Sequence, residues 1–162
     1  IGKNNIDKLS KKPSIRCSSQ KWKDKQEIIN SRDIDLLNKL CNNIEFDGAI
    51  EVKNELNKKI EGYKNQDIKK NIDTTDNLIT YDELLNKLMM SDLKCYYCKK
   101  EVKLMYTDVR DNEQWTLDRL NNGMGHTNNN TVICDLKCNL QRRCQSDELF
   151  LYSKRLKIIK TE

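Results

Sequence analysis

Two pairs of cysteines flank the only histidine of this chain. Cys95 and Cys98 form the first pair, Cys134 and Cys138 form the second, and His126 lies between them. Each pair can present two thiolates from one tight turn, and Zn²⁺ takes four such ligands in a tetrahedral arrangement. These four cysteines are therefore expected to hold a structural zinc ion and to enclose the segment that carries the chemistry.

The enclosed segment, WTLDRLNNGMGHTNNNTVI, is polar and contains groups suited to hydrolysis of a phosphodiester. This reaction needs a cation at the phosphate, a base that takes a proton from water, and stabilisation of the leaving oxygen. Asp118 is a suitable carboxylate ligand for a hard cation such as Mg²⁺. His126 is the only imidazole, and its ordinary pKa of about 6.5 suits a general base. A histidine that contacts phosphate and a purely structural histidine are the alternatives.

Helices in the first half of the chain are expected to lead to these residues. The spacing of apolar residues predicts helices over about 22–44, interrupted near Ser31 as a candidate N-cap, and over 48–72. Thr80 and Glu83 match a capping box, in which each side chain satisfies a free backbone N–H of the other residue. This box predicts a helix that leads to the first cysteine pair.

The C-terminal half is expected to contain strand, loop, strand and helix in that order. Alternating apolar residues predict strands at 102–105, 115–120 and 131–133, and a helix is expected to start at the second cysteine pair. Ser146 is expected to cap a last helix, whose inward-facing residues would be Leu149, Phe150, Tyr152 and Leu156. The predicted fold class is therefore α+β, a mainly helical chain with a zinc-stabilised ββα core in its C-terminal half.

Charge is distributed unevenly along the chain. Residues 1–30 carry a net charge of +5, residues 31–93 carry −4, and residues 140–162 carry +3. Basic segments beside a metal site favour contact with phosphate, although solvated surface lysines explain residues 1–30 equally well. We expect two parts: a basic arm and helical region over 1–79, and the zinc-containing domain over 80–162.

Neither a membrane span nor a secretory signal is evident in the sequence. Apolar runs fall well short of the roughly 18 residues that cross a bilayer. The seven cysteines, an odd number in a lysine-rich chain, favour free thiols over disulfides. We therefore expect no membrane contact, and a reducing intracellular compartment rather than secretion.

The order and spacing of these motifs resemble the HNH, or His-Me finger, endonucleases. The resemblance covers about residues 80–160 and rests on CYYC, on WTLDRLNNGMGHTNNNTVIC and on the CN at 138–139. It extends to the zinc-binding branch, which includes phage endonucleases that resolve recombination junctions. The resemblance implies a ββα unit around one divalent metal, Mg²⁺ or Mn²⁺, that hydrolyses the backbone of duplex or branched DNA.

The resemblance also implies roles for single residues. Asp118 matches the metal-binding aspartate of the family's DH dipeptide, and Asn139 matches an asparagine that adds a side-chain oxygen to the metal. Asn130 matches the middle asparagine of HNH, which orders the loop. Arg119 stands where family members usually have histidine, and arginine cannot take a proton at neutral pH. Arg119 is therefore expected to hold a phosphate, which leaves His126 as the base.

The zinc site departs from the family pattern as well. The closest pattern has two cysteines in a row before CN, and Asp135 occupies the second of these positions here. Zinc accepts thiolate or carboxylate ligands, so Asp135 could replace Cys134, and Cys144 is an outside candidate. Four thiolates are the favoured set because they make the stronger structural site.

The sequence thus predicts a metal-dependent endonuclease of the HNH type with a structural Zn²⁺. The candidates for contact with DNA backbone phosphates are Arg142, Arg143, Lys21, Lys23 and Lys25. The helical N-terminal region could also form a homodimer or bind a protein partner. The main alternative is a non-catalytic, zinc-stabilised module that binds nucleic acid or protein, because the usual histidine is missing.

Overall fold

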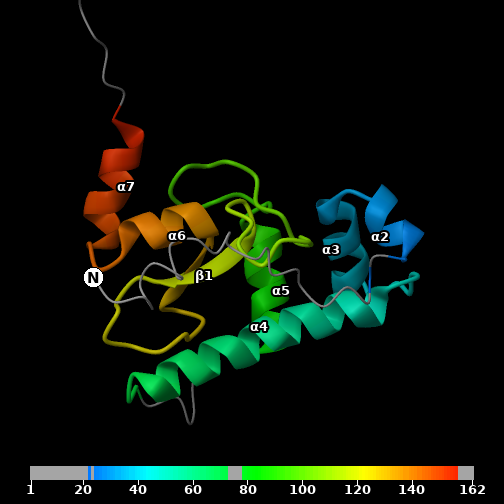
Figure 1. Ribbon diagram of the computed structural model, residues 1–162, viewed down its shortest axis with the longest axis horizontal. Coiled ribbons are helices and arrows are strands. Elements are labelled where there is room, and N and C mark those ends of the chain that lie inside the picture. The colour runs from blue at the N-terminus through cyan, green and yellow to red at the C-terminus, as the bar shows by residue number, and fades with distance from the viewer. Residues whose placement is uncertain (1–21, 23, 73–77, 157–162) are drawn as a thin grey trace, which may run out of the picture.

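Six helices and two strands make up the part of the chain that the structure, a computed structural model, describes: residues 22, 24–72 and 78–156 (Figure 1). In chain order these elements are α2 (Gln26–Asn30), α3 (Asp33–Cys41), α4 (Ala49–Lys69), α5 (Tyr81–Met90), β1 (Trp115–Arg119), β2 (Thr131–Asp135), α6 (Leu136–Arg142) and α7 (Asp147–Arg155). This mixture of helices and a small antiparallel sheet confirms the α+β class. Lys21 and Lys23 lie outside the described residues, so their phosphate contacts stay predictions.

Side-chain caps fix where two of the helices begin. Thr80 Oγ1 accepts a hydrogen bond from the Glu83 N–H at 3.3 Å, and the Thr80 N–H donates to Glu83 Oε2 at 2.8 Å. This capping box confirms the predicted start of α5. Ser146 caps α7 as predicted. The expectation for Ser31 is wrong, because its N–H closes the last turn of α2 and Arg32 precedes the first residue of α3.

The two strands and α6 follow the predicted order of strand, loop, strand and helix. β1 and β2 pair in antiparallel register, with Trp115 opposite Asp135 and Arg119 opposite Thr131. Helix α6 follows β2 directly, because the Asp135 carboxylate caps it by accepting a hydrogen bond from the Cys138 N–H. The second cysteine pair therefore spans the junction between a strand and a helix.

Residues 102–105 do not form the predicted strand. Near this segment the chain makes only two isolated bridges within the described residues, Lys94 to Glu101 and Lys103 to Gln114. The Leu104 N–H donates to the Asp33 carboxylate at 2.7 Å rather than to a neighbouring strand. A side-chain acceptor from α3 thus replaces the strand partner that the alternating pattern implied.

Helix α4 lies along β1 and supplies partners for its free edge. The Tyr63 hydroxyl accepts a hydrogen bond from the Leu117 N–H at 2.9 Å. Lys59 Nζ donates to the Trp115 carbonyl oxygen. An edge strand carries backbone groups that no neighbouring strand satisfies, and these side chains satisfy two of them. The helix is thereby held against the strand that carries Asp118.

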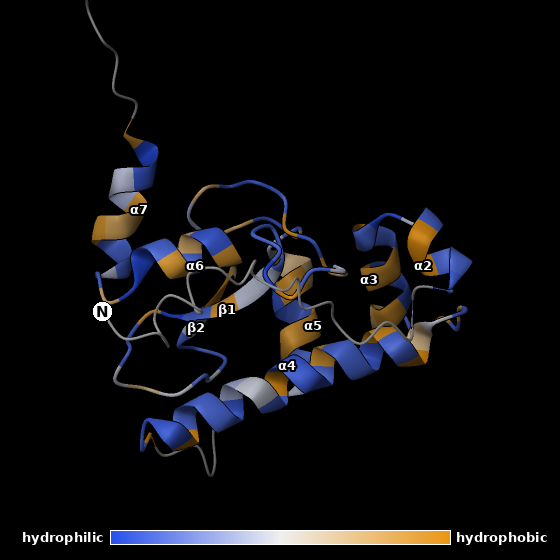
Figure 2. Ribbon diagram, viewed as in Figure 1, coloured by the Kyte–Doolittle hydropathy of each residue, from blue (hydrophilic) through white to orange (hydrophobic). Residues whose placement is uncertain are grey.

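One hydrophobic core contains residues from both sides of position 79. Leu36 and Leu56 come from the first segment, and Leu88 and Trp115 come from the second. Figure 2 shows apolar residues on α3 and α5, whereas α4 is largely hydrophilic. The division into parts 1–79 and 80–162 stays a prediction. None of the described helices combines the length and the apolar character that crossing a membrane requires.

Helix α7 buries less of its surface than its sequence pattern predicts. Phe150 is buried and meets the Tyr97 ring edge-on, with 4.9 Å between ring centroids. Leu149, Tyr152 and Leu156 each have more than half of their surface exposed. The prediction that these three residues face the core is wrong, because α7 lies at one end of the molecule and its other side faces solvent (Figure 1).

Candidate metal centre and adjoining cleft

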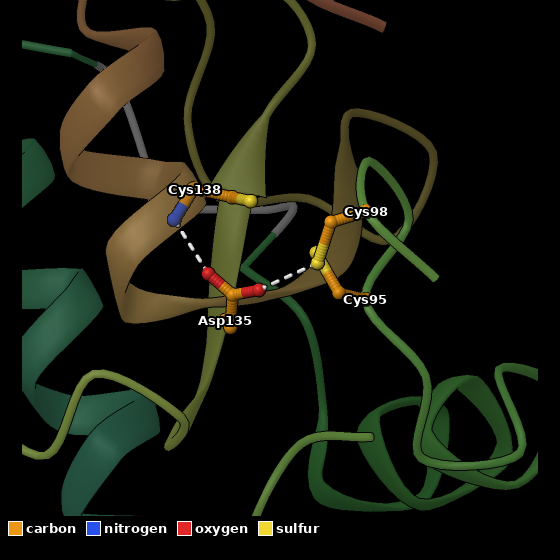
Figure 3. A group of neighbouring side chains, drawn as sticks. All are labelled: Cys95, Cys98, Asp135 and Cys138. Atoms are coloured by element: carbon orange, nitrogen blue, oxygen red, sulfur yellow. Dashed lines mark hydrogen bonds between the residues drawn. The ribbon is translucent and has the colours of Figure 1, made fainter. Parts of the chain in front are cut away.

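Three thiols and one carboxylate converge where β2 meets α6 (Figure 3). The Sγ atoms of Cys95, Cys98 and Cys138 and a carboxylate oxygen of Asp135 all lie within 4.8 Å of one another. The ligands of a tetrahedral zinc ion, each about 2.3 Å from the metal, lie ~3.8 Å apart, so a small closure of the cluster suffices. These four side chains could therefore hold a metal ion such as zinc.

Two short segments deliver the four ligands. Cys95 and Cys98 lie in a turn after α5, which is closed by hydrogen bonds from the Cys95 N–H to the Lys100 carbonyl at 2.8 Å and from the Lys99 N–H to the Cys95 carbonyl at 3.0 Å. The other two ligands come from the end of β2 and from the first turn of α6. The cluster therefore joins the turn that follows α5 to the junction of β2 and α6.

Cys134 is not part of this cluster, so the expectation of four thiolate ligands is wrong. Adjacent residues of a strand point to opposite faces, and it is Asp135 whose face meets the other cysteines. The Cys134 sulfur is buried on the other face, 3.2 Å from Thr116 Oγ1. Asp135 is the fourth member of the cluster in place of Cys134, which was the alternative expected from the sequence. Cys144 is exposed and lies outside the cluster.

The protonation of the cluster depends on burial and on the carboxylate. Burial, together with the hydrogen bond to Asp135, raises the pKa of the Cys98 thiol to about 11. Burial also raises the pKa of Cys138. Burial acts to raise the pKa of Asp135, but hydrogen bonds from Cys98 and Cys138 outweigh this effect and lower it. Without a metal the Cys98 and Cys138 thiols are therefore protonated at neutral pH, and zinc binding must release protons.

A cleft of about 570 Å³ opens beside the cluster, between α4, β1 and α6. It is lined by four of the residues that the sequence predicts to act in catalysis: Asp118, Arg119, His126 and Asn139. The cationic side chains that line it are Lys58, Lys59, Lys70, Arg119 and Arg143. Asp118 is the one acidic residue among the described lining residues. This excess of positive charge favours a ligand that carries phosphate.

His126 is held by a buried carboxylate that the sequence analysis does not identify. Its Nδ1 lies 2.8 Å from Asp67 Oδ1, and its backbone N–H donates to Asp67 Oδ2 at 2.7 Å. The ring stacks on Tyr63 with 4.6 Å between centroids. Burial lowers the pKa of His126, and the contact with Asp67 opposes this shift without cancelling it. The imidazole is therefore neutral at pH 7, and because a carboxylate accepts hydrogen bonds, Nδ1 carries the proton and Nε2 is the acceptor.

Arg119 shares the carboxylate that holds His126. Its Nη1 lies 3.3 Å from Asp67 Oδ1 and donates to the Met124 carbonyl at 3.1 Å. Arg119 is buried but still lines the cleft. Its positive charge therefore lies beside His126, and its expected hold on a phosphate stays a prediction.

Asp118 has its own cation. Arg142 Nη1 lies 2.8 and 2.9 Å from the two carboxylate oxygens, and the Tyr97 hydroxyl donates to Oδ2 at 2.7 Å. Arg142 is only 1% exposed and also donates to the carbonyls of Arg119 and Leu120. The expectation that Arg142 contacts DNA phosphates is wrong, because this network buries its guanidinium group. A divalent cation at Asp118 would have to share the carboxylate with Arg142.

Two asparagines hold the hairpin in shape. Asn139 Nδ2 donates to Thr116 Oγ1 at 3.0 Å and to a β1 carbonyl at 3.4 Å. Asn130 Oδ1 accepts from the Asn121 N–H at 2.9 Å, and its Nδ2 donates to the carbonyls of Asn121 and Gly125 at 3.0 Å. Asn130 therefore ties the loop between the strands together through hydrogen bonds to its backbone. The role of Asn139 as a metal ligand stays a prediction.

The two remaining candidates for phosphate contact differ in position. Lys25 Nζ forms an ion pair with Asp47 at 2.7 Å, away from the residues that line the cleft. Arg143 is exposed and lines the cleft beside Asn122, whose Nδ2 donates to the Arg143 carbonyl at 3.3 Å. Of these two residues, Arg143 is the one placed to meet a ligand in the cleft.

Helix α4 supplies three site residues that the sequence analysis does not propose: Lys59, Tyr63 and Asp67. They recur at every fourth position and so share one face of the helix, and this spacing was the available signal. Lys59 Nζ lies 4.2 Å from the centre of the Trp115 ring. Burial lowers the pKa of Lys59 to about 7. A lysine on the cleft wall therefore titrates near neutral pH.

Comparisons with protein-family models, with curated proteins and with solved structures found no match to this chain.

Proposed function

We propose that the protein is an HNH-type endonuclease that hydrolyses DNA phosphodiester bonds in the cleft between α4, β1 and α6. The observation that supports this proposal most strongly is His126, a neutral imidazole held by Asp67 in a cleft whose charged lining residues are five cations and one carboxylate. A carboxylate behind a histidine fixes its tautomer and stabilises the imidazolium that forms when the ring takes a proton. A base and cations in one cleft are the groups that hydrolysis of a phosphodiester needs.

In this proposal His126 Nε2 takes a proton from a water molecule that attacks the phosphorus. A new P–O bond forms, the bond to the leaving oxygen breaks and that oxygen takes a proton from solvent, while negative charge develops on the phosphoryl oxygens. Arg119, Arg143 and Lys59 line the cleft and would stabilise that charge. Asp67 acts through His126 and is a positioning residue.

Structural Zn²⁺ is assigned to the cluster of Cys95, Cys98, Asp135 and Cys138, where it would add to the stability of the fold. Catalytic Mg²⁺ or Mn²⁺, which would polarise a phosphoryl oxygen, has less support. Asp118 and Asn139 are its proposed ligands, but both Asp118 oxygens already accept hydrogen bonds from Arg142. As arranged, these residues fit a divalent cation only if the ion and Arg142 share the Asp118 carboxylate.

A plasmid-nicking assay tests the proposal with the zinc-loaded protein over pH 6–9, with Mg²⁺, with Mn²⁺ and with neither. We expect nicking that His126→Ala reduces by at least about 100-fold, because a general base contributes about 10²–10⁴-fold. Asp67→Asn should lower the rate and shift its pH profile. Asn57→Ala, on an exposed part of α4 outside the cleft lining, is the matched control. DNA that stays intact under all three conditions would contradict the proposal.

The second candidate function is a non-catalytic module that binds nucleic acid. The pairing of Asp118 with Arg142 favours it, because a guanidinium stands where a catalytic carboxylate would meet a metal. The same assay separates the two functions when it is combined with a DNA-binding measurement. An enzyme with His126→Ala loses cleavage and keeps binding, whereas a binding module has no cleavage to lose.

A further inference from the structure

The wall of the cleft formed by α4 contains a glycine that protein packing does not explain. Gly62 lies in the interior of a 21-residue helix and is half-buried. Glycine weakens a helix interior because it loses more backbone freedom on folding than any other residue. Beyond its chain neighbours and the nearby backbone of its own helix, a Cβ atom at Gly62 would meet no atom within 4 Å, so no packed group excludes a side chain there.

Cationic and polar residues lie on both sides of this glycine. Lys58 and Lys59 precede it, Gln66 and Lys70 follow it, and all four line the same cleft. The distance from Lys58 to Lys70 is about 18 Å along a helix that rises 1.5 Å per residue. That length is enough to meet several phosphates of one nucleic-acid strand.

We propose that Gly62 leaves the α4 wall open so that a sugar–phosphate backbone can lie against the helix between Lys58 and Lys70. This inference deepens the proposed function and rests on it, because it names the surface that binds the substrate backbone. A bare helix backbone allows the closest approach, and the flanking ammonium groups then reach phosphates on either side. Lys58, whose side chain is 62% exposed, also pairs with the half-buried Glu55 at 3.8 Å, a long contact with which a phosphate can compete.

The arrangement predicts opposite effects on folding and on binding when a side chain is added. Gly62→Ala and Gly62→Gln should raise the melting temperature by about 2–4 °C, because both residues favour helix over glycine and the space is open. Gly62→Gln should weaken binding by about tenfold, since its side chain fills the approach to the helix. Gly62→Ala should have a smaller effect in the same direction.

Fluorescence anisotropy of a short labelled duplex DNA, with zinc-loaded full chain and without added Mg²⁺ or Mn²⁺, measures this binding. Asn57→Ala is the matched control, because it also raises helix propensity but is exposed and lies outside the cleft lining. It should keep the Kd within about twofold of the wild type. A duplex RNA of the same sequence, measured in parallel, shows which backbone the wall accepts.

Failure of this inference is distinguishable from failure of the proposed function. Wild-type protein that binds and nicks DNA, with an unchanged Kd for Gly62→Gln, overturns the inference and leaves the proposed function standing. A melting temperature of Gly62→Gln below that of the wild type also overturns it, because α4 would then pack against something at that position. Wild-type protein that binds neither duplex overturns both.

Discussion

The two aspartates of the hairpin, Asp135 of β2 and Asp118 of β1, have different kinds of partner. Asp135 lies among three thiols that can release their protons to solvent when a metal ion binds. Asp118 lies against the guanidinium of Arg142, which stays charged at any ordinary pH. The cluster can therefore accept a metal cation, whereas the carboxylate of Asp118 is already paired with the cationic side chain of Arg142. The partner of a buried carboxylate, and not the carboxylate itself, decides whether a metal can bind.

The difference also separates what each region contributes to the fold. A metal that binds only the folded state adds its binding free energy to stability. A buried ion pair gives little net stability, but loss of one partner leaves an uncompensated charge in the interior. We therefore expect the cluster to dominate stability when zinc is bound and the Asp118–Arg142 pair to matter most when it is broken.

The largest expected effect comes from removal of a cluster ligand. Cys98→Ser should reduce bound zinc from about one ion per chain to near zero, measured by inductively coupled plasma mass spectrometry. It should also lower the melting temperature by more than about 10 °C, because structural zinc contributes many kcal/mol to small domains.

Cys134→Ser is the control for this change, because it makes the same replacement at a buried cysteine of β2 that faces Thr116 and not the cluster. It should keep one zinc ion per chain. The comparison between the two aspartates fails if Cys134→Ser loses zinc while Asp135→Asn retains it.

A smaller effect is expected when Arg142 is replaced. Arg142→Met leaves Asp118 buried without its cation and should lower the free energy of unfolding by about 3–5 kcal/mol, measured by urea denaturation. Asp118→Asn in the same chain should recover part of this loss, because it removes the unpaired charge. Arg143→Met is the control, since this neighbouring arginine is exposed. Equal losses for the two arginine variants would show that the pair with Asp118 is not special.

The smallest effect is the pH dependence that His126 gives to the free energy of unfolding. Its folded pKa lies below the unfolded value of about 6.5, so the unfolded chain binds more protons in the window between the two. Stability should therefore fall as the pH drops below about 6.5, by less than 1.4 kcal/mol per pH unit, and be unaffected by His126 above it. Urea denaturation at pH 7.5 and 5.5 measures this. His126→Gln should lose this part of the dependence, and a variant with the full wild-type slope would refute the assignment.

The amino-acid sequence by itself determined the local features of this protein. The capping box at Thr80, the cap at Ser146 and the order of strand, loop, strand and helix all depend on residues within a few positions of one another. The places of Cys95, Cys98 and Cys138 in the cluster also depend on local structure, because a turn holds the first two and the start of α6 holds the third. Asn130 belongs here too, since it bonds to backbone groups of its own loop.

Only the tertiary structure decided between chemically similar neighbours. Asp135 rather than Cys134 faces the cluster, and Arg142 rather than Arg143 is buried, because the direction of each side chain depends on which face of its element meets the core. Asp67 reaches His126 across 59 positions of the sequence. Such a contact depends on how α4 packs along β1, and no local pattern records the packing of distant elements.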